Sequence, residues 1–427
     1  MAAPQAKADP TAARLAGLGL PEGGAWASEA RAAALMRLTA MGLPGRRDEY
    51  WRWTDPAALN AAEAVPAAVF DPREPPPFDG VDRLKVVFVD GVFDAARSDD
   101  LAGTGIEIGR LAEAGERDIH WARRLYGRLE AAGQTPVARP FAALNTATAT
   151  DGVIRATGQA ARPVALVCLR QSETSDAVLH HLVRVEPGAS VTVLESGPAA
   201  ARLNAVMEVD VAEGGAFHHV RIQGRDHERR AVTHLFARVD RGATFKSFTL
   251  TKNGRLTRNE TVIDIAGDGA VAHVAGACVG DGDFHHDDTV FVTHDAVGCE
   301  SRQVFKKVLR GGATGVFQGK ILVKPGAQQT DGYQLSQSLL LDEASQFLAK
   351  PELEIYADDV KCSHGSTSGA IDETALFYLR ARGVPAAEAT DLLVLAFLAE
   401  ALDEVEDEAL REEIRGRLDG WLARHRK

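Results

Sequence analysis

One short stretch of the sequence places a thiol and an imidazole two residues apart. Cys362 and His364 lie within residues 358–365, on the turn expected after an alternating, strand-like run at 353–356. Both side chains are ligands for zinc and iron. Two ligands cannot close a metal site, so a transferable cluster bound here would need further ligands from another chain. Lys361 beside Cys362 would favour the thiolate. The alternative is a small buried cysteine and a turn or cap histidine without function.

A second group of histidines and carboxylates lies further upstream. Such side chains together can bind zinc or iron. Their spacing does not match the 27-residue repeat of the surrounding sequence, so convergence on one site is not expected. We interpret the histidines as lying on a solvated or interface face of strands. The group comprises His273, His285, His286, His294, Asp287, Asp288 and Cys299.

The sequence contains none of the common motifs for nucleotide binding or hydrolysis. The stretch 315–321 is one residue short of a phosphate-binding loop and lacks the Ser or Thr that would hold Mg²⁺. Neither a G-x-S-x-G elbow nor an H-E-x-x-H helix is present. We therefore expect that the chain does not bind ATP through such a loop. A β-helical carbohydrate-cleaving enzyme, which needs paired carboxylates in a groove, is an alternative function for the chain.

The composition is that of a globular protein that does not bind nucleic acid. The chain has 427 residues and a formal net charge of −12, whereas phosphate contacts need clustered Lys and Arg. Its four cysteines form no C-x-x-C pair, which argues against a disulfide framework. The N-terminus lacks the pattern of a signal peptide, and no apolar run approaches the ~20 residues of a membrane helix. We expect a cytoplasmic protein.

A repeat of 27 residues runs through the middle of the chain. Each unit begins with a Gly-Ala pair and continues into a short run with the alternation of a β-strand. A unit of this length, with two strands and two tight turns, is typical of one coil of a β-solenoid. A β-sandwich is the alternative. The pairs are Gly188-Ala189, Gly215-Ala216, Gly242-Ala243 and Gly269-Ala270.

These patterns divide the chain into three regions. Residues 1–145 are predicted to be mostly helical, with a helix over 28–41 capped by Ser28 and a strand over 84–90. Residues 146–365 form the solenoid, and residues 366–427 are helical. The last helix has an apolar stripe at i, i+4, i+8, i+11 and i+12, preceded by an acidic connection that we expect to be solvated. The stripe is Leu410, Ile414, Leu418, Trp421 and Leu422, and the acidic residues are Asp403, Glu404, Glu406, Asp407 and Glu408.

Several stretches resemble the SufB/SufD family of iron–sulfur cluster assembly proteins. The resemblance is dense in the C-terminal half and sparse in the first half. SufB-type chains carry a Glu-His-Glu-type stretch where Cys362-Ser363-His364-Gly365 stands here, and tend to be longer and richer in cysteine. The chain is therefore similar to the SufD branch, and a SufB-type paralogue is the alternative. The similar stretches are 49–54, 141–146, 315–320, 329–331, 339–341, 351–365 and 376–383.

The resemblance implies a mainly β fold, with a right-handed parallel β-helix flanked by N-terminal and C-terminal α-helical regions. It implies a non-catalytic scaffold that pairs with a SufB-like paralogue through the β-helix. The C-terminal helical region would dock a SufC-like ABC ATPase. A homodimer is possible for the isolated chain. The residues expected to dock the ATPase are Leu376, Phe377, Tyr378, Arg380, Arg382 and Phe397.

The family's cluster-binding histidine corresponds to His364, and Cys362 is the weaker candidate. The implied cofactor is a transient iron–sulfur cluster shared with the partner. Flavin is expected only in the assembled complex, since the sequence shows no flavin motif, and nothing is expected to bind the isolated chain tightly. A purely structural protein without metal contact would share the fold and differ only at these two residues.

Overall fold

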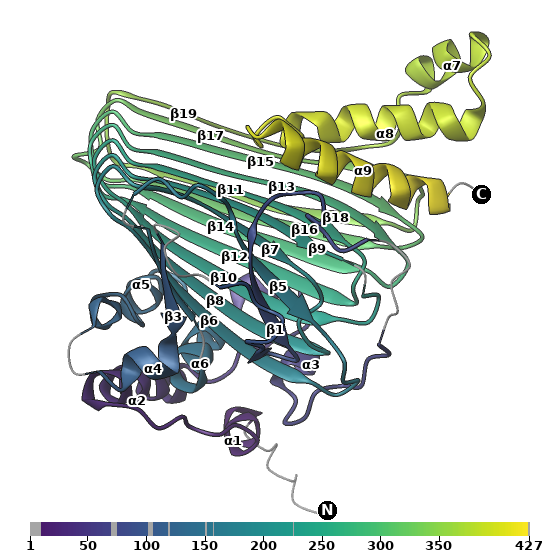
Figure 1. Cartoon of the computed structure of the whole chain (residues 1–427). Helices are drawn as coiled ribbons and strands as arrows, with labels where there is room; N and C mark the ends of the chain where they lie inside the picture. Colours follow the sequence, from purple (N-terminus) through teal and green to yellow (C-terminus); the bar gives the residue numbers. More distant parts are fainter. Residues whose placement is uncertain are drawn as a thin grey trace, which may run out of the picture.

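The chain folds into a parallel β-solenoid with helices at both ends of the sequence (Figure 1). The computed structural model describes residues 10–69, 75–100, 106–117, 120–149, 152–156, 158–224 and 226–425. Within these residues, the strands form two sheets, and successive strands of the solenoid alternate between them. The predicted mainly β fold and solenoid are confirmed.

Sheet A contains ten strands and sheet B nine within the described residues. In spatial order, sheet A is β19 (Val360–Gly369), β17 (Thr330–Leu340), β15 (Glu300–Arg310), β13 (Val271–Asp281), β11 (Thr244–Lys252), β9 (Ala216–Gln223), β7 (Ser190–Ser196), β5 (Val164–Leu169), β1 (Leu84–Val89) and β2 (Val92–Phe93). Sheet B is β18 (Gln346–Ile355), β16 (Thr314–Val323), β14 (His285–His294), β12 (Leu256–Ile265), β10 (Arg230–Val239), β8 (Arg202–Val211), β6 (Asp176–Val185), β4 (Gly152–Ala156) and β3 (Ile106–Arg110).

Glycine turns set the length of each coil. A glycine with φ between 60° and 69° precedes successive strands of sheet A, in the left-handed region that glycine enters without strain. The next residue is small and buried. Three of the four predicted Gly-Ala pairs therefore occupy the bends, and Gly215-Ala216 is shifted by one residue because Gly214 has the left-handed φ and Ala216 begins β9. The glycine and the small residue that follows it are Gly188-Ala189, Gly214-Gly215, Gly242-Ala243, Gly269-Ala270 and Gly298-Cys299.

Side chains alternate between the space enclosed by the two sheets and their outer faces. The enclosed core contains aromatic residues from both sheets, including Phe217, Phe245, Phe305 and Phe317. The rings of Phe305 on β15 and Phe317 on β16 lie 5.0 Å apart and join the sheets directly. Burying each such side chain contributes about 1.5–3 kcal/mol, so the repeated inward positions stabilise the stack.

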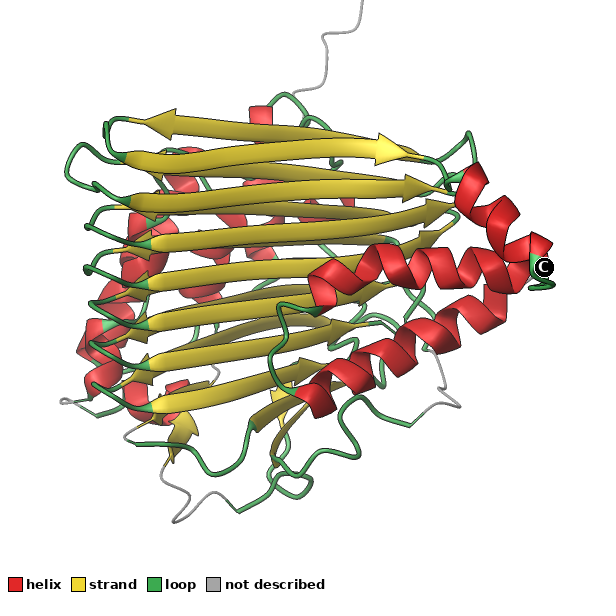
Figure 2. Ribbon diagram, turned by 90° about the horizontal axis from the view of Figure 1, so that it is seen from above, coloured by secondary structure: helices red, strands yellow, loops and turns green. Residues whose placement is uncertain are grey.

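The helices cover the outer faces (Figures 1 and 2). The N-terminal helices pack on sheet B, where α6 is buried between α2 and β8, and α8 crosses β13 and β15 of sheet A. The N-terminal helices are α1 (Pro10–Ala16), α2 (Ala25–Met41), η1 (Glu49–Trp51), α3 (Ala57–Asn60), α4 (Leu111–Gly115), η2 (Trp121–Arg124), α5 (Arg128–Ala132) and α6 (Pro140–Thr148). The C-terminal helices are α7 (Glu373–Ala381), α8 (Ala386–Leu402) and α9 (Glu408–His425).

Two local predictions were wrong and two are confirmed. The first long helix begins at Ala25 with Gly24 as its N-cap, and Ser28 lies inside it, donating from Oγ to Gly23 O at 2.9 Å. The α8–α9 connection is docked on sheet A rather than wholly solvated. In contrast, the strand near 84–90 is present as β1, and the whole apolar stripe of α9 is buried.

Candidate cluster site at the open end of the solenoid

The last coil of the solenoid has two free strand edges. Within the described residues, β18 pairs only with β16 and β19 only with β17. Free edges present unpaired N–H and C=O groups that invite pairing with another chain. Pro351 in β18 is typical of an edge strand, because proline cannot donate to a ladder. Both predicted cluster residues lie on this last coil.

Cys362 lies on β19, not on a turn, and its side chain faces inward. It packs with Ile321 and Val323 of the opposite sheet, and a methyl group added at Gly332 would lie 3.2 Å from its Sγ. Burial raises the pKa of the Cys362 thiol. Lys361 projects to the opposite face of the strand, so the expected stabilisation of the thiolate by this lysine is wrong. Cys362 is a half-buried, protonated thiol.

His364 shares the inward face with Cys362 but is exposed. The two residues are two positions apart on a strand, so their side chains point to the same side. In the described part of the chain no further coil follows β19, and the imidazole is therefore left uncovered. Neither ring nitrogen is hydrogen-bonded to the part of the chain that the structure describes. An exposed imidazole with a free nitrogen is a ligand available to a group outside the chain.

Polar side chains surround this position on the inward face. Gln334 is the Cα partner of His364, and its Nε2 donates to Gln303 Oε1 at 2.8 Å. Further along β17, Ser336 donates to Ser366 at 3.0 Å, and Ser338 donates to Ser368 at 2.8 Å. The end of the enclosed space is thus lined by amides and hydroxyls, with one imidazole and one thiol.

The upstream histidines do not form a metal site. His286 is buried, with Nδ1 at 2.8 Å from Lys307 Nζ, and Lys307 also donates to Asp288 at 2.5 Å. His294 is buried with Nε2 at 2.8 Å from Ser301 Oγ. The expectation of a solvated face is therefore wrong for these two. Among the described residues, no three His, Cys, Asp or Glu side chains are arranged to hold a metal ion.

The other histidines of this group are also engaged. Nε2 of His285 lies 3.0 Å from Thr54 Oγ1. His273 lies between two carboxylates, with Nε2 at 3.0 Å from Glu300 and Nδ1 at 3.1 Å from Glu404. Cys299 is buried in the small-residue position of a turn. The buried position of the Cys299 side chain is explained by packing at this turn.

A buried charge network, missed from the sequence, fastens the N-terminal segment to sheet B. Arg258 donates to Glu260 at 2.8 Å and to Asp287 at 2.5 Å, and it stacks over Trp51 with Cζ at 4.1 Å from the ring centroid. Burial acts to raise the pKa of Glu260, but the charge of Arg258 and its other neighbours outweighs burial and lowers it to about 2. Tyr50 donates to Glu352 on the edge strand β18 at 2.5 Å. The signal in the sequence was the aromatic stretch at 49–54, whose docking role could not be inferred without its partners.

The residues predicted to dock an ATPase fall into two groups. Leu376, Phe377, Tyr378 and Arg380 lie on α7 and Arg382 directly after it; α7 has no buried residue and extends beyond the end of the sheets (Figure 1). Phe377 is 72% exposed and Tyr378 56%. Phe397 lies apart on α8, half-buried, with Lys306 Nζ 4.9 Å from its ring centroid. The structure brings together the first five residues but not Phe397.

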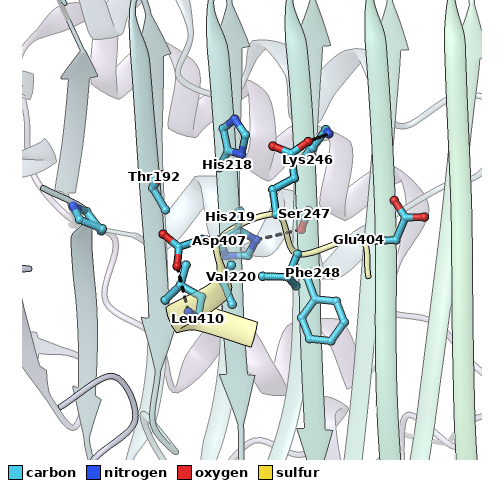
Figure 3. A pocket seen from close by; sticks show the side chains of 13 residues that line it. Thr192, His218, His219, Val220, Lys246, Ser247, Phe248, Glu404, Asp407 and Leu410 are labelled. Carbon is cyan, nitrogen blue, oxygen red and sulfur yellow. Dashed lines mark hydrogen bonds and ion pairs between the residues drawn. The ribbon is translucent and has the colours of Figure 1, made fainter. Parts of the chain in front are cut away.

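A pocket lies between the outer face of sheet A and the α8–α9 connection (Figure 3). Glu404 accepts from Arg302 Nε at 2.5 Å, and Glu406 pairs with Lys246. The cavity measures ≈ 70 Å³. The acidic connection is therefore an electrostatic attachment of the C-terminal helices to the sheet.

The amino-acid sequence is similar to those of known iron–sulfur cluster assembly proteins. Residues 168–397 match the family described as SUF system FeS cluster assembly, SufBD core domain. The chain is 29% identical to iron–sulfur cluster assembly protein SufD of Escherichia coli over 400 residues, covering 90% of each chain. It is 29% identical to an iron–sulfur cluster assembly SufBD family protein of Synechocystis over 88% of this chain and 87% of the relative, and 27% identical to SufD of Bacillus subtilis over 60% of each. Every helix among the described residues is too short or too polar to span a bilayer.

Proposed function

The chain belongs to the SufBD core family of SUF-system iron–sulfur cluster assembly, and from this premise we propose that it is a non-catalytic, SufD-type scaffold subunit that contributes His364 to a cluster shared with a partner. The observation that carries the proposal is the position of His364. It lies on the inward face of the last strand, exposed, with both ring nitrogens unengaged by the described residues. The cluster is cargo, and an incomplete ligand set allows it to be released.

The partner we propose is a SufB-like paralogue that pairs with the free edges of β18 and β19. Two edges at one end of a solenoid offer a second solenoid two ladders of backbone hydrogen bonds. Pairing there would cover His364 and bring ligands from the partner next to it. Cys362 is the weaker ligand, because its thiol packs inward and burial raises its pKa.

The second proposed partner is a SufC-like ABC ATPase bound through α7. Exposed aromatic side chains beside arginines are typical of interface hot spots, and Arg382 lies with Cζ 3.7 Å from the Tyr378 ring centroid. Because α8 packs on β13 and β15, a movement of α7 and α8 would be transmitted to sheet A. The energy for assembly would come from this partner.

Flavin, which the family resemblance associates with the assembled complex, does not fit the pocket at the α8–α9 connection. The cavity of ≈ 70 Å³ is far smaller than the ~300 Å³ lower range of cofactor pockets. Glu404, Glu406 and Asp407 line it and would repel a phosphate. This pocket is therefore not assigned to flavin, which stays an expectation for the assembled complex.

The test is reconstitution of the complex with substituted chains. A tagged chain is co-expressed with its SufB-like and SufC-like partners, purified, and loaded anaerobically with iron and sulfide. We expect His364→Ala to leave the subunit ratio unchanged and to remove most of the iron and acid-labile sulfide bound per complex. Cys362→Ser should lose a smaller share of the bound iron and sulfide than His364→Ala.

The matched control is Ser363→Ala, whose side chain lies on the opposite face of the same strand. It should load like the wild-type chain. Wild-type loading by His364→Ala would refute the ligand role. Failure to recover either partner from a soluble, expressed chain would refute the scaffold role.

A further inference from the structure

Beside His364 lies a buried glutamine with an unused oxygen. Gln334 on β17 is the Cα partner of His364 in the parallel ladder, and neighbouring strands lie about 4.8 Å apart. Paired residues of a parallel ladder project to the same face. Gln334 is therefore the neighbour of the imidazole on the side of the covered coils.

The side chain of Gln334 is held in place by the opposite sheet. A methyl group added at Gly319 on β16 would lie 2.7 Å from Gln334 Cδ, closer than real Cβ contacts allow. The bare backbone of Gly319 therefore leaves the space that the amide of Gln334 occupies. The glutamine is 0% exposed, so its side chain is enclosed by the surrounding packing.

The hydrogen bonds of Gln334 are incomplete. Its Nε2 donates to Gln303 Oε1 at 2.8 Å, which fixes the direction of the amide. Its Oε1 is buried and finds no donor among the residues that the structure describes. An unpaired buried amide oxygen is destabilising, and most such oxygens in folded proteins have a partner. His364, the Cα partner of Gln334 on β19, has a ring N–H without a hydrogen bond to the described residues.

We propose that Gln334 is a positioning residue whose Oε1 accepts the ring N–H of His364, so that the other ring nitrogen faces outward with a free lone pair. This inference rests on the proposed ligand role of His364. A neutral imidazole has one N–H and one lone pair, and a carbonyl acceptor selects which nitrogen carries the proton. Metal-binding histidines commonly have such a partner.

The choice of an amide suits a ligand that must release its cargo. A carboxylate acceptor increases the basicity of an imidazole more than a neutral amide does, and so strengthens its bond to metal. Gln334 orients the ring without adding charge to the inward face. The stack of Gln303, Gln334 and His364 thus orients the ligand from within the solenoid.

The test observes the tautomer of His364 directly in the full-length isolated chain. Selective ¹⁵N labelling of histidine and long-range ¹⁵N–¹H correlation give the protonation of each ring nitrogen, and His364→Ala assigns the signal. We expect a single tautomer in the wild-type chain and a mixture in Gln334→Met. Gln334→Glu should restore the single tautomer, because it keeps an oxygen acceptor and the free Nε2 of Gln303 can donate to it.

The control is Gln337→Met on the outward face of β17, which should leave the His364 signal unchanged. If Gln334→Met does not fold, Gln334→Leu replaces it. In the reconstituted complex, we expect Gln334→Met to weaken cluster binding about tenfold. An unchanged single tautomer in folded Gln334→Met or Gln334→Leu overturns the inference even if His364→Ala abolishes loading. Normal cluster loading by His364→Ala overturns the proposed ligand role of His364. The tautomer measurement then still tests separately whether Gln334 orients the ring.

Discussion

His219 and His364 occupy the same inward column of sheet A and differ in what covers them. His219 is buried in the middle of the solenoid, with Nδ1 at 2.9 Å from Ser247 Oγ and Nε2 at 3.2 Å from Glu195. Burial lowers its pKa. His364 ends the column on β19 and has no covering coil. The column runs His219, Ser247, Val274, Gln303, Gln334 and His364.

The comparison teaches that a structural histidine differs from a candidate ligand in whether a ring nitrogen is free and exposed, since the residue type is the same. Both nitrogens of His219 are engaged, so it has no lone pair left for a metal. Lys307 and Asp288 are likewise paired with each other inside the covered coils. Among the residues that the structure describes, only the end of the stack leaves an inward-facing imidazole exposed, and this is where a partner solenoid would join.

The largest effect should follow from breaking a charge pair in the covered coils. Lys307→Met leaves the Asp288 carboxylate buried without its cation, which we expect to lower the free energy of unfolding by about 3–5 kcal/mol. Urea unfolding measures this as a lower midpoint. The same substitution at exposed Lys361 on β19 should change it by less than about 0.5 kcal/mol. Equal losses would contradict the distinction between covered and open coils.

Glycine-to-alanine substitutions should destabilise the covered coils more than the last coil. Gly319→Ala collides with the enclosed Gln334 and should cost about 1–3 kcal/mol. Gly332→Ala meets Cys362 Sγ at 3.2 Å on the last strand, which has room to shift, so its cost should be under about 1 kcal/mol. The two urea midpoints decide this. A larger loss at Gly332 would mean that the last coil is packed as tightly as the middle.

A buried neutral histidine should make stability depend on pH. Burial lowers the pKa of His294 from its ordinary 6.5 to about 4. Between these values the unfolded chain binds more protons than the folded one, so stability falls as the pH is lowered from 6.5 to 4. His294→Gln should reduce this slope by up to about 1.4 kcal/mol per pH unit. Urea unfolding at several pH values measures the slope, and an unchanged slope would show that His294 is protonated equally in both states.

The smallest effect on stability should come from His364 itself. His364→Ala removes an exposed side chain, and water at the open end can replace its ring N–H on Gln334 Oε1, so the free energy of unfolding should change by less than about 0.5 kcal/mol. His219→Ala, in the same column, should cost about 1–3 kcal/mol because Ser247 and Glu195 lose a buried partner. Thermal or urea unfolding of both variants tests this. A destabilised His364→Ala chain would indicate a structural role.

Much of the solenoid could be read from the sequence because its determinants are local. A bend needs a glycine in the left-handed region followed by a small buried residue, and Gly188-Ala189 and Gly242-Ala243 show this directly. The pattern was lost where Gly298 is followed by Cys299, because cysteine fills the alanine position with a different letter. The prediction that Ser28 caps the helix was wrong because Ser28 has the chemistry of an N-cap, but Gly24 is the N-cap and the helix begins at Ala25.

The candidate site was located from the sequence but not explained by it. The resemblance of 351–365 to a known family identified His364 and Cys362, whereas the pattern alone placed them on a turn. The wrong expectation for Lys361 shows why: neighbours in sequence lie on opposite faces of a strand. The role of Gln334 could not be predicted, because it depends on Gly319 across the enclosed space and on His364 one coil later.

Strand alternation, glycine bends and the apolar stripe of α9 are properties of neighbouring residues, so the sequence alone was sufficient to establish them. Which inward-facing polar groups are covered is decided by the number of coils stacked beyond them, and that is a property of the assembled solenoid. His219 and His364 illustrate the limit, since both are histidines on sheet strands of one column. Stacking buries the first and engages both of its nitrogens, and the end of the stack leaves the second exposed.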